Sequence, residues 1–532
     1  MPAFPDSRPI QPPRPWLVLL LCGIYLLTGV IGHDPWKSED AIHLGVAWGI
    51  FNGEGWLVPR IAGEPWMGTT PAWHWVAAIL ARLTSWALPF HDGARLATPA
   101  FGALLLLGLH RAAGLLHGHD RGTALIAPLL AIGTLGLLVP SHLAHPAIAV
   151  LAATSAAFIG LALLPQQPAP GTAWLALGVG GAFLFGGLGS VAPLLPLLLL
   201  PAVRRQWLVL FFAIYLSLAV ASIWPTLLAL RIPEHLTAWW RHELDGAALR
   251  LAFPAKHLKL LGWFTWPLWP IAIWVAWSAW RHRRHWRDDW SLLVPMAGTL
   301  SALAWFLTHE ARPLNAMPLV VPLCLLAAAG VDRLRRGATG ALDWFGMMTF
   351  TLVTGLVWLG ASAMLAGWPP RVARNFVKLA PGFVAEVSVP ALLAGLAITA
   401  VWGLLLLRLP RSSWRATARW AGGVAVPWAL VMTLWLPWID HGRTNRSAAA
   451  GLRKAIGQDS GCIVRSGLGA SQRASLDYFA GIRTLPRSAG ADCRWLLAQE
   501  GSRRNARPGW KEVWEGGRPG DRHERLRLYL RD

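Results

Sequence analysis

Three acidic residues follow the first apolar segment closely enough to share one site. Asp34, Glu39 and Asp40 lie within seven residues of one another. A carboxylate at the mouth of a helix bundle is costly to desolvate, so such residues are often functional, and one of them could accept a proton as a general base. The alternative is a solvated loop in which Asp40 caps the next helix. The spacing alone favours this alternative.

Two other groups of residues could do chemistry. His142 and His145 have the i, i+3 spacing of metal ligands on a helix. With no third ligand nearby and Pro146 breaking the turn, we interpret them as a helix-end pair and predict no metal site. A polar cluster between residues 231 and 258 is either a solvated loop or part of a substrate site. Its members are Glu234, His235, Arg241, His242, Glu243 and Asp245.

The segments that must position these residues are long and apolar. Of the 532 residues, 55% are hydrophobic and only 14% are charged, and the mean hydropathy is +0.43. Soluble proteins are about 25% charged, so we predict an all-α polytopic membrane bundle of about 13 helices with a small C-terminal α/β domain. The stretch 172–203 is interrupted at Gly186–Gly189 and by prolines, which suggests one crossing plus a half-helix. The helices are expected at 15–32, 72–90, 95–116, 122–139, 146–164, 172–203, 206–230, 259–280, 290–308, 315–332, 343–367, 389–408 and 418–438.

The basic residues predict the orientation in the membrane. The formal net charge of +21 is not accompanied by an RNA- or DNA-binding motif, and the basic residues form short clusters between apolar segments, as in cytoplasmic loops. The first apolar segment has no cleavage site and should be a retained helix. We therefore predict a bacterial inner-membrane protein with a cytoplasmic N-terminus. The clusters are Arg204-Arg205, residues 281–285, Arg333/Arg335/Arg336 and Arg408/Arg411/Arg415/Arg419.

Residues 439–532 alternate helical and strand-like patterns and predict a small α/β domain. The odd number of predicted helices, and the cluster Arg408–Arg419 just before the last one, predict that this domain is periplasmic. Cys462 and Cys493 each begin a predicted strand. Outside the cytoplasm thiols can oxidise, and neighbouring strands could bring these residues within disulfide range. Two unpaired thiols are nearly as good an interpretation. Cys22 and Cys324 lie in apolar segments, where we expect them to be packing residues.

Residues 33–71 carry a recognisable order of motifs. The pair Glu39-Asp40 precedes a surface helix, and then follow Gly53-Glu54-Gly55-Trp56, Val58-Pro59 and Gly63-Glu64-Pro65. Further along, Arg95 opens the third helix, and Glu310-Ala311-Arg312 precedes Met317-Pro318. This order resembles the C-type membrane glycosyltransferases, specifically the protein O-mannosyltransferase and lipid A aminoarabinose transferase family (glycosyltransferase family 39-like). The resemblance covers residues 1–438, with 33–71 as the first external loop.

The resemblance implies transfer of a sugar from a polyprenyl-phosphate donor to a lipid, glycan or protein acceptor at the outer face of the inner membrane. Glu39 and Asp40 take the catalytic positions. One carboxylate would act as base or orient the sugar, and a second, or a divalent cation, would help the phosphate to leave. We expect the substrate-binding residues of this chain to be Asp34, Arg60, Arg241, His242, Lys256, His257, Glu310 and Arg312.

The chain departs from the family pattern where cations are expected. The family's Glu-Lys-Pro-Pro run is here Met67-Gly68-Thr69-Thr70-Pro71, and a Lys-Gly pair appears as Gly186-Gly187. We expect Arg312, or one of Arg241, His242, Lys256 and His257, to supply the missing cation. The alternative function is a non-catalytic, isoprenoid-lipid-binding or partner-assisting membrane protein on the same scaffold. A transporter is less well supported, because ionisable residues are nearly absent from the helix centres.

Overall fold

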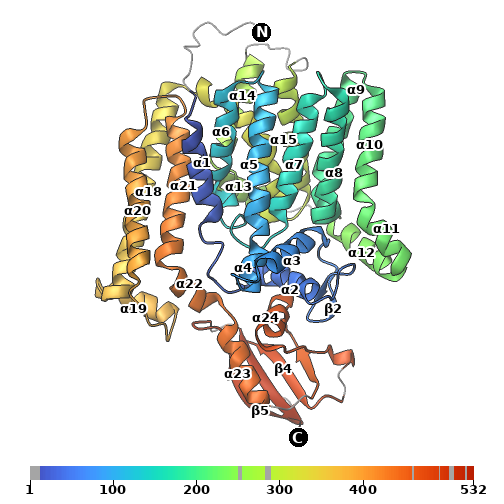
Figure 1. Ribbon diagram of the computed structural model, residues 1–532, viewed down its shortest axis with the longest axis vertical. Helices are drawn as coiled ribbons and strands as arrows, with labels where there is room; N and C mark the ends of the chain where they lie inside the picture. The colour runs from blue at the N-terminus through green and yellow to red at the C-terminus, as the bar shows by residue number, and fades with distance from the viewer. Residues whose placement is uncertain are drawn as a thin grey trace.

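The chain forms a bundle of long apolar helices with a small mixed domain at one end (Figure 1). The computed structural model describes residues 12–249, 254–281, 289–457, 461–489, 492–501, 508–521 and 524–531. Most of the basic run predicted at 281–285 lies outside the described residues. The bundle comprises α1 (Pro15–Leu27), α5 (Ala97–Leu116), α6 (Arg121–Ile132), α7 (Ala147–Leu163), α8 (Pro168–Val191), η2 (Ala192–Leu199), α9 (Leu200–Val203), α10 (Trp207–Ala221), α13 (Pro254–Phe264), α14 (Leu268–Arg281), α15 (Trp290–Thr308), α17 (Val320–Ala328), α18 (Arg336–Ala366), α20 (Val389–Arg408) and α21 (Arg415–Leu434).

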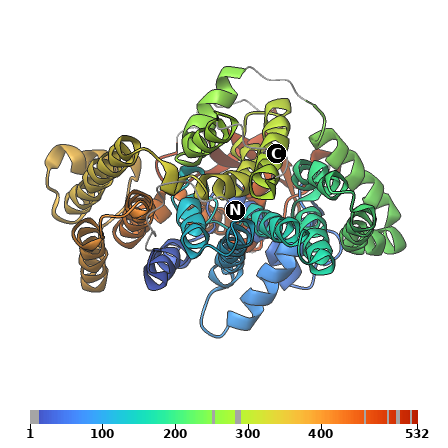
Figure 2. The same cartoon turned by 90° about the horizontal axis from the view of Figure 1, so that it is seen from above.

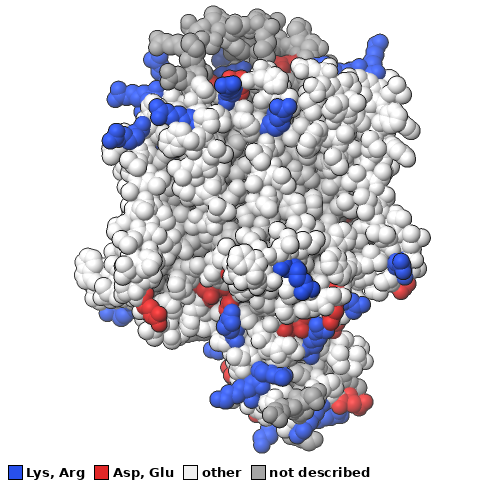
Figure 3. Space-filling model, viewed as in Figure 1, with Lys and Arg blue, Asp and Glu red and all other residues white. Residues whose placement is uncertain are grey.

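The length and composition of the helices agree with a membrane bundle. Within the described part of the chain, five helices are long and apolar enough to cross a membrane, or up to eight if each bent pair is one span. Charged side chains gather at both ends of the visible face, with a broad uncharged band between them (Figure 3). In the view from above, the gold and orange helices of residues 336–434 stand to one side of the others (Figure 2). The predicted class is thus confirmed in outline, and the count of thirteen stays a prediction.

Short elements connect the helices, and many of them lie at the end of the bundle that faces the C-terminal domain (Figure 1). Among them, α3 has 13 residues and packs against α2 and α4 at this end of the bundle (Figure 1), and it is not among the described helices that are apolar enough for a membrane. The prediction of a membrane helix at 72–90 is therefore corrected. The short elements are α2 (Glu39–Phe51), β1 (Arg60–Ile61), β2 (Glu64–Pro65), α3 (Ala72–Thr84), α4 (Phe90–Arg95), η1 (Leu135–Leu137), α11 (Ile223–Arg231), α12 (Pro233–Gly246), α16 (Pro313–Ala316), η3 (Met317–Leu319), η4 (Val331–Arg333), α19 (Pro370–Leu379) and α22 (Leu436–Arg443).

Helices α7 and α8 pack backbone to backbone. Only residues 164–167 connect them, so the two helices run antiparallel. A Cβ atom at Gly178 would lie 2.2 Å from the Ala157 amide nitrogen, which no side chain tolerates. Small residues permit this close approach, which is how helices associate in lipid without a hydrophobic driving force between them.

The chain then reverses direction at Gly187, whose φ of +71° interrupts the helix. Ser301 of α15 donates a hydrogen bond to the Pro193 carbonyl at 2.6 Å, and the Arg204 guanidinium lies 4.6 Å from the centre of the Trp290 ring. Residues 193–204 therefore run antiparallel to α15, away from the end where α8 finishes. The stretch 172–203 therefore forms two antiparallel legs. The sequence predicted one crossing plus a half-helix, so the second leg is longer than expected.

The C-terminal segment folds as a small α/β unit. Its sheet has the order β3-β4-β6-β5, with β3 and β4 parallel and the other pairs antiparallel. Because β3 and β4 begin side by side, Cys462 and Cys493 form a disulfide with a Cα–Cα distance of 5.1 Å. Of the two alternatives for these thiols, the disulfide is confirmed. The elements are α23 (Arg446–Ile456), β3 (Ile463–Ser466), α24 (Ala470–Ala480), η5 (Arg487–Ala489), β4 (Trp495–Glu500), β5 (Trp510–Gly516) and β6 (Arg525–Arg531).

Candidate active site

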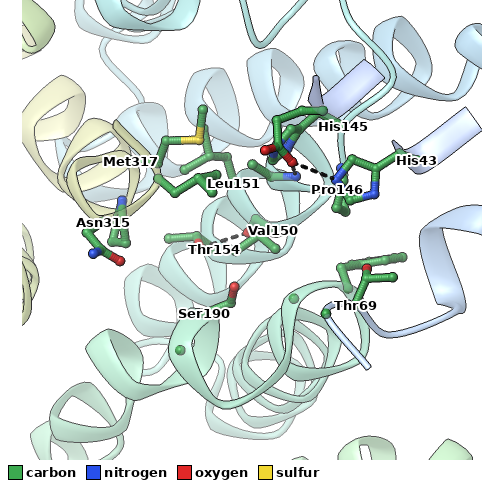
Figure 4. A pocket seen from close by; sticks show the side chains of 18 of the residues that line it. His43, Thr69, His145, Pro146, Val150, Leu151, Thr154, Ser190, Asn315 and Met317 are labelled. Carbon is green, nitrogen blue, oxygen red and sulfur yellow. Dashed lines mark hydrogen bonds and ion pairs between the residues drawn. The ribbon is translucent and has the colours of Figure 1, made fainter. Parts of the chain in front are cut away.

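A cavity of about 250 Å³ lies at the end of the bundle that faces the C-terminal domain. Its wall combines α2, the loop before α3, the start of α7, the C-terminal end of α8, and parts of α12, α15, α16 and η3. Apolar side chains form much of the wall. Figure 4 shows His43 and His145 close together, with Asn315, Ser190 and Thr69 around the same space. The polar lining residues are Glu39, His43, Thr69, His145, Thr154, Ser190, Glu243 and Asn315.

Glu39 is the predicted catalytic carboxylate that lines this cavity. It is the first residue of α2, and its side chain is half exposed. One of its carboxylate oxygens lies 3.7 Å from His43 Nε2. Burial raises the pKa of Glu39, and the nearby charge of Arg312 partly opposes that rise. A carboxylate in such a setting is a stronger base than a solvated one.

Asp40 has the opposite environment and does not line the cavity. It is fully buried, and it accepts hydrogen bonds from Arg95 Nη2 at 3.1 Å, from the Ala144 amide at 2.7 Å and from the Trp36 amide at 2.9 Å. Burial would raise the pKa of Asp40, but the charge and hydrogen bonds of Arg95 outweigh it and hold the pKa below its usual range. The ionised carboxylate therefore ties α2 to α4 and to the loop before α7.

A second carboxylate enters the cavity at the chain reversal. Glu243 of α12 accepts a hydrogen bond from the Leu188 amide at 2.6 Å, and burial raises the pKa of Glu243. Gly187 makes this approach possible, since a Cβ there would lie 2.3 Å from Glu243 Oε2. The cavity thus holds two carboxylates, on helices α2 and α12, that lie about 200 residues apart in sequence.

Three histidines lie together beside Glu39. His43 Nδ1 and His74 Nε2 are 3.0 Å apart, and His74 Nδ1 is 3.1 Å from the Thr70 carbonyl oxygen. The ring of His145 meets that of His43 edge-on, with centroids 4.9 Å apart. Burial lowers the pKa of His74 to about 3 and that of His145 to about 4, so both imidazoles are neutral at pH 7.

The predicted cations are not inside the cavity. Among the residues that the structure describes, no lysine or arginine lines it. Arg241, His242 and Lys256 are exposed, whereas His257 is buried and contacts the His309 carbonyl at 2.9 Å. Arg312 is exposed and pairs with Glu310 at 2.8 Å. Its charge acts on Glu39, so of these candidates Arg312 is the cation best placed for the site.

Two further predicted residues serve other contacts. Asp34 is buried and pairs with Arg446, whose Nε donates to Asp34 Oδ2 at 2.8 Å. Arg60 donates to the Gly63 carbonyl at 2.8 Å within the β1–β2 hairpin. Neither residue lines the cavity.

The sequence-based site omits His43, His74 and Asn315, and treats His145 only as a helix-end residue. The i, i+4 spacing of Glu39 and His43 on one helix was an available signal. His145 was paired in sequence with His142, but the fold separates them. His142 contacts the backbone carbonyls of Leu138 and Tyr25, whereas His145 lies beside His43.

No protein-family model and no curated protein matches this sequence. Among solved structures, the chain is similar to ArnT from Cupriavidus metallidurans bound to undecaprenyl phosphate, with 16% identity, a TM-score of 0.69, and coverage of 96% of this chain and 97% of that chain. ArnT from the same organism in the apo state matches with 14% identity and a TM-score of 0.67 over the same shares of the two chains. The likeness shows that the whole chain has the fold of ArnT, which confirms the resemblance seen in the sequence.

Proposed function

We propose that this chain, built on the fold of ArnT, transfers a sugar from a polyprenyl-phosphate donor to a lipid, glycan or protein acceptor at the outer face of the bacterial inner membrane. One observation carries the proposal. A partly apolar cavity containing Glu39 and Glu243 lies at the end of a membrane bundle, and the bundle shares the fold of a protein crystallised with undecaprenyl phosphate. Such a place lets an isoprenoid tail remain in lipid while its phosphosugar head enters a polar pocket.

The reaction requires a base and stabilisation of a departing phosphate. The acceptor hydroxyl oxygen attacks the anomeric carbon of the sugar and loses its proton to a carboxylate. The bond from that carbon to the phosphate oxygen breaks, and polyprenyl phosphate leaves with the electron pair. Glu39 and Glu243 are the residues proposed to share the work of base and of orienting the sugar. Asn315 and Ser190 offer hydrogen-bond donors, and Arg312 offers positive charge near Glu39.

Asp40 has a positioning role in this proposal. Its bond to Arg95 holds the first turn of α2, so that Glu39 projects toward the cavity. The remaining predicted substrate-binding residues, Arg60, Arg241, His242, Lys256 and His257, lie outside the cavity wall. In this proposal they contact only the parts of donor or acceptor that extend beyond it.

The proposal also includes the orientation of the chain. Residues 1–438 form the membrane domain, and 439–532 form a domain on the periplasmic side. The disulfide between Cys462 and Cys493 supports that side, because disulfides persist in oxidising compartments.

The test is sugar transfer by the full-length protein in nanodiscs, supplied with polyprenyl-phosphate sugars and an extract of cell-envelope lipids and glycans. Lipid analysis of a deletion strain would identify the natural pair, as an unmodified acceptor and an accumulated donor. E243Q and E39Q should each lower turnover by about 100-fold or more. E234Q is the matched control, because Glu234 lies on the same helix as Glu243 and its side chain is 73% exposed. Wild-type turnover in both cavity variants would refute the assigned roles.

A second function is favoured by a specific observation. The part of the cavity wall that the structure describes has no lysine or arginine, which is unusual for a site that must stabilise a leaving phosphate. A non-catalytic isoprenoid-lipid-binding protein has no such need. It would bind polyprenyl phosphate in nanodiscs without turnover, and the deletion strain would accumulate no donor.

A further inference from the structure

The side chains of Glu39, His43 and His145 converge in the cavity wall. One oxygen or nitrogen ligand atom from each residue lies within 4.8 Å of those of the other two. Glu39 and His43 come from the first two turns of α2, and His145 from the loop before α7. All three line the cavity, so an ion bound among them would face open space on one side.

The hydrogen bonds behind His43 fix which of its nitrogens faces the other two residues. The Thr70 carbonyl oxygen only accepts, so His74 Nδ1 carries the proton and His74 Nε2 has the lone pair. His43 Nδ1 must then donate to His74 Nε2, and His43 Nε2 is left with a free lone pair. This is the nitrogen that lies 3.7 Å from Glu39. A ligating histidine typically has its other nitrogen held by such an outer contact.

His145 requires one local exchange before it can ligate. Its Nδ1 accepts a hydrogen bond from the Ala147 amide at 3.0 Å. Ala147 is the first residue of α7 and itself lines the cavity, so water can take over that amide when the His145 imidazole binds an ion. Amides in the first turn of a helix have no partner within the helix and accept such substitutes.

The charge balance of the cavity also favours a cation. Its described wall holds two carboxylates, Glu39 and Glu243, and no lysine or arginine. A phosphate group entering this space would meet negative charge only, apart from Arg312 near its edge. A divalent ion at the three residues would offset the carboxylates and supply positive charge inside the cavity.

We propose that Glu39, His43 and His145 bind one divalent metal ion of the zinc class, with an open coordination position toward the cavity. Two imidazole nitrogens and one carboxylate form a ligand set that suits Zn²⁺ with a fourth, exchangeable ligand, whereas Mg²⁺ prefers oxygen ligands. The role of the ion rests on the proposed function: it would bind the donor phosphate, and Glu243 would be left as the base. The site itself is independent of that function.

The test is metal binding by the full-length protein, purified in detergent with a tag that contains no histidine and stripped with a chelator. Titration with ZnCl₂ should show one equivalent bound, and Co²⁺ should give the visible absorption of a tetrahedral site. E39Q, H43A and H145A should each weaken Zn²⁺ binding by roughly tenfold or more. H119A and E234Q are the controls, since both residues are exposed on other elements.

Three results would overturn the proposal: no binding by the wild type, wild-type affinity in E39Q, or an equal loss in the H119A control. Thermal unfolding followed by tryptophan fluorescence identifies a variant that does not fold, and E39Q then decides, because the Glu39 side chain is half exposed. The two proposals fail separately. Zinc binding without any sugar transfer refutes the glycosyltransferase alone, and transfer by a protein that binds no zinc refutes the metal site alone.

Discussion

Two adjacent acids, Glu39 and Asp40, show how strongly environment separates residues of similar chemistry. Successive residues of a helix point about 100° apart, so the turn that directs Glu39 toward the cavity directs Asp40 into the protein. Glu39 remains half exposed, whereas Asp40 is fully buried against Arg95. Only the first is placed to meet a substrate.

D40N should destabilise the protein, because Asp40 is a buried structural residue. It removes the charge of one of the two carboxylates that pair with the fully buried Arg95, and Asp92, 3.1 Å from Arg95 Nη1, remains, so we expect a cost of about 1–3 kcal/mol. The free energy of unfolding, measured by denaturant titration with tryptophan fluorescence, should fall accordingly. E39Q is the control and should change stability by less than about 1 kcal/mol. Equal stability of D40N and the wild type would argue against a structural role for Asp40.

Gly187 offers a second test at the residue scale. Its φ of +71° and ψ of −160° belong almost only to glycine, and a Cβ would collide with the Glu243 carboxylate. We expect G187A to cost about 1–3 kcal/mol and to lower transfer activity, because Glu243 must move. G355A is the control, since a Cβ at Gly355 meets nothing within 4 Å. Full activity in G187A would show that Glu243 is not needed where the structure has it.

At the scale of elements, ion pairs dock the C-terminal domain on the first external segment. Glu64 of the β1–β2 hairpin accepts hydrogen bonds from both Nη atoms of Arg465, at 2.5 and 2.7 Å, and from Arg473 at 2.6 Å. His91 and Tyr478 join α4 to α24 at 2.7 Å. α24 also packs along α2, the helix that carries Glu39 and His43. The domain therefore supports the wall of the cavity.

E64Q should loosen this docking by about 1–3 kcal/mol, because it removes charge from three hydrogen bonds in a partly buried site. Hydrogen exchange of α24 amides should become faster. E54Q is the control, since the Glu54–Arg483 pair is about 40% exposed on both sides and such pairs contribute little. Unchanged exchange in E64Q would show that apolar contacts alone hold the domain.

Acid should weaken the same docking. Burial would raise the pKa of Asp34, but hydrogen bonds from Arg446 and Thr444 outweigh it, and the pKa is lowered. The pKa of Glu64 is lowered in the same way by Arg465 and Arg473. Stability from such carboxylates is complete above their unfolded pKa of about 4 and is lost as pH falls through the lowered folded values. Proteolysis of the tail should therefore rise only in this acidic range, and less steeply in D34N.

At the scale of the whole molecule, the start of α1 and the C-terminal sheet lie at opposite ends of the bundle (Figure 1). We predict that the tail faces the periplasm. In right-side-out spheroplasts, an impermeant maleimide should label Cys462 and Cys493 only after an impermeant reductant is added, because the two thiols form a disulfide. Labelling restricted to inside-out vesicles would show the reverse topology. C462S/C493S is the control for labelling elsewhere.

The sequence alone determined the class of this protein and most of its elements. Apolar segments too long and too numerous for a soluble core require lipid, and the order of motifs over residues 33–71 was enough to predict the fold that this chain shares with ArnT. The sequence also predicted that Cys462 and Cys493 each begin a strand, but it left the pairing of the two strands open. These features depend on local composition and spacing, which a single chain displays directly.

Only the tertiary structure decided what surrounds each polar group. The sequence pattern predicted a membrane crossing at 72–90, where the structure has a short helix at the end of the bundle. It predicted one crossing plus a half-helix at 172–203, where the structure has two legs. These two errors have opposite effects on the predicted orientation of the chain ends. Nothing in the spacing separated Glu39 from Asp40, joined His145 to His43, or brought Glu243 to Gly187. Those contacts depend on how helices distant in sequence pack together, and packing is set by the summed contacts of many side chains and not by any one motif.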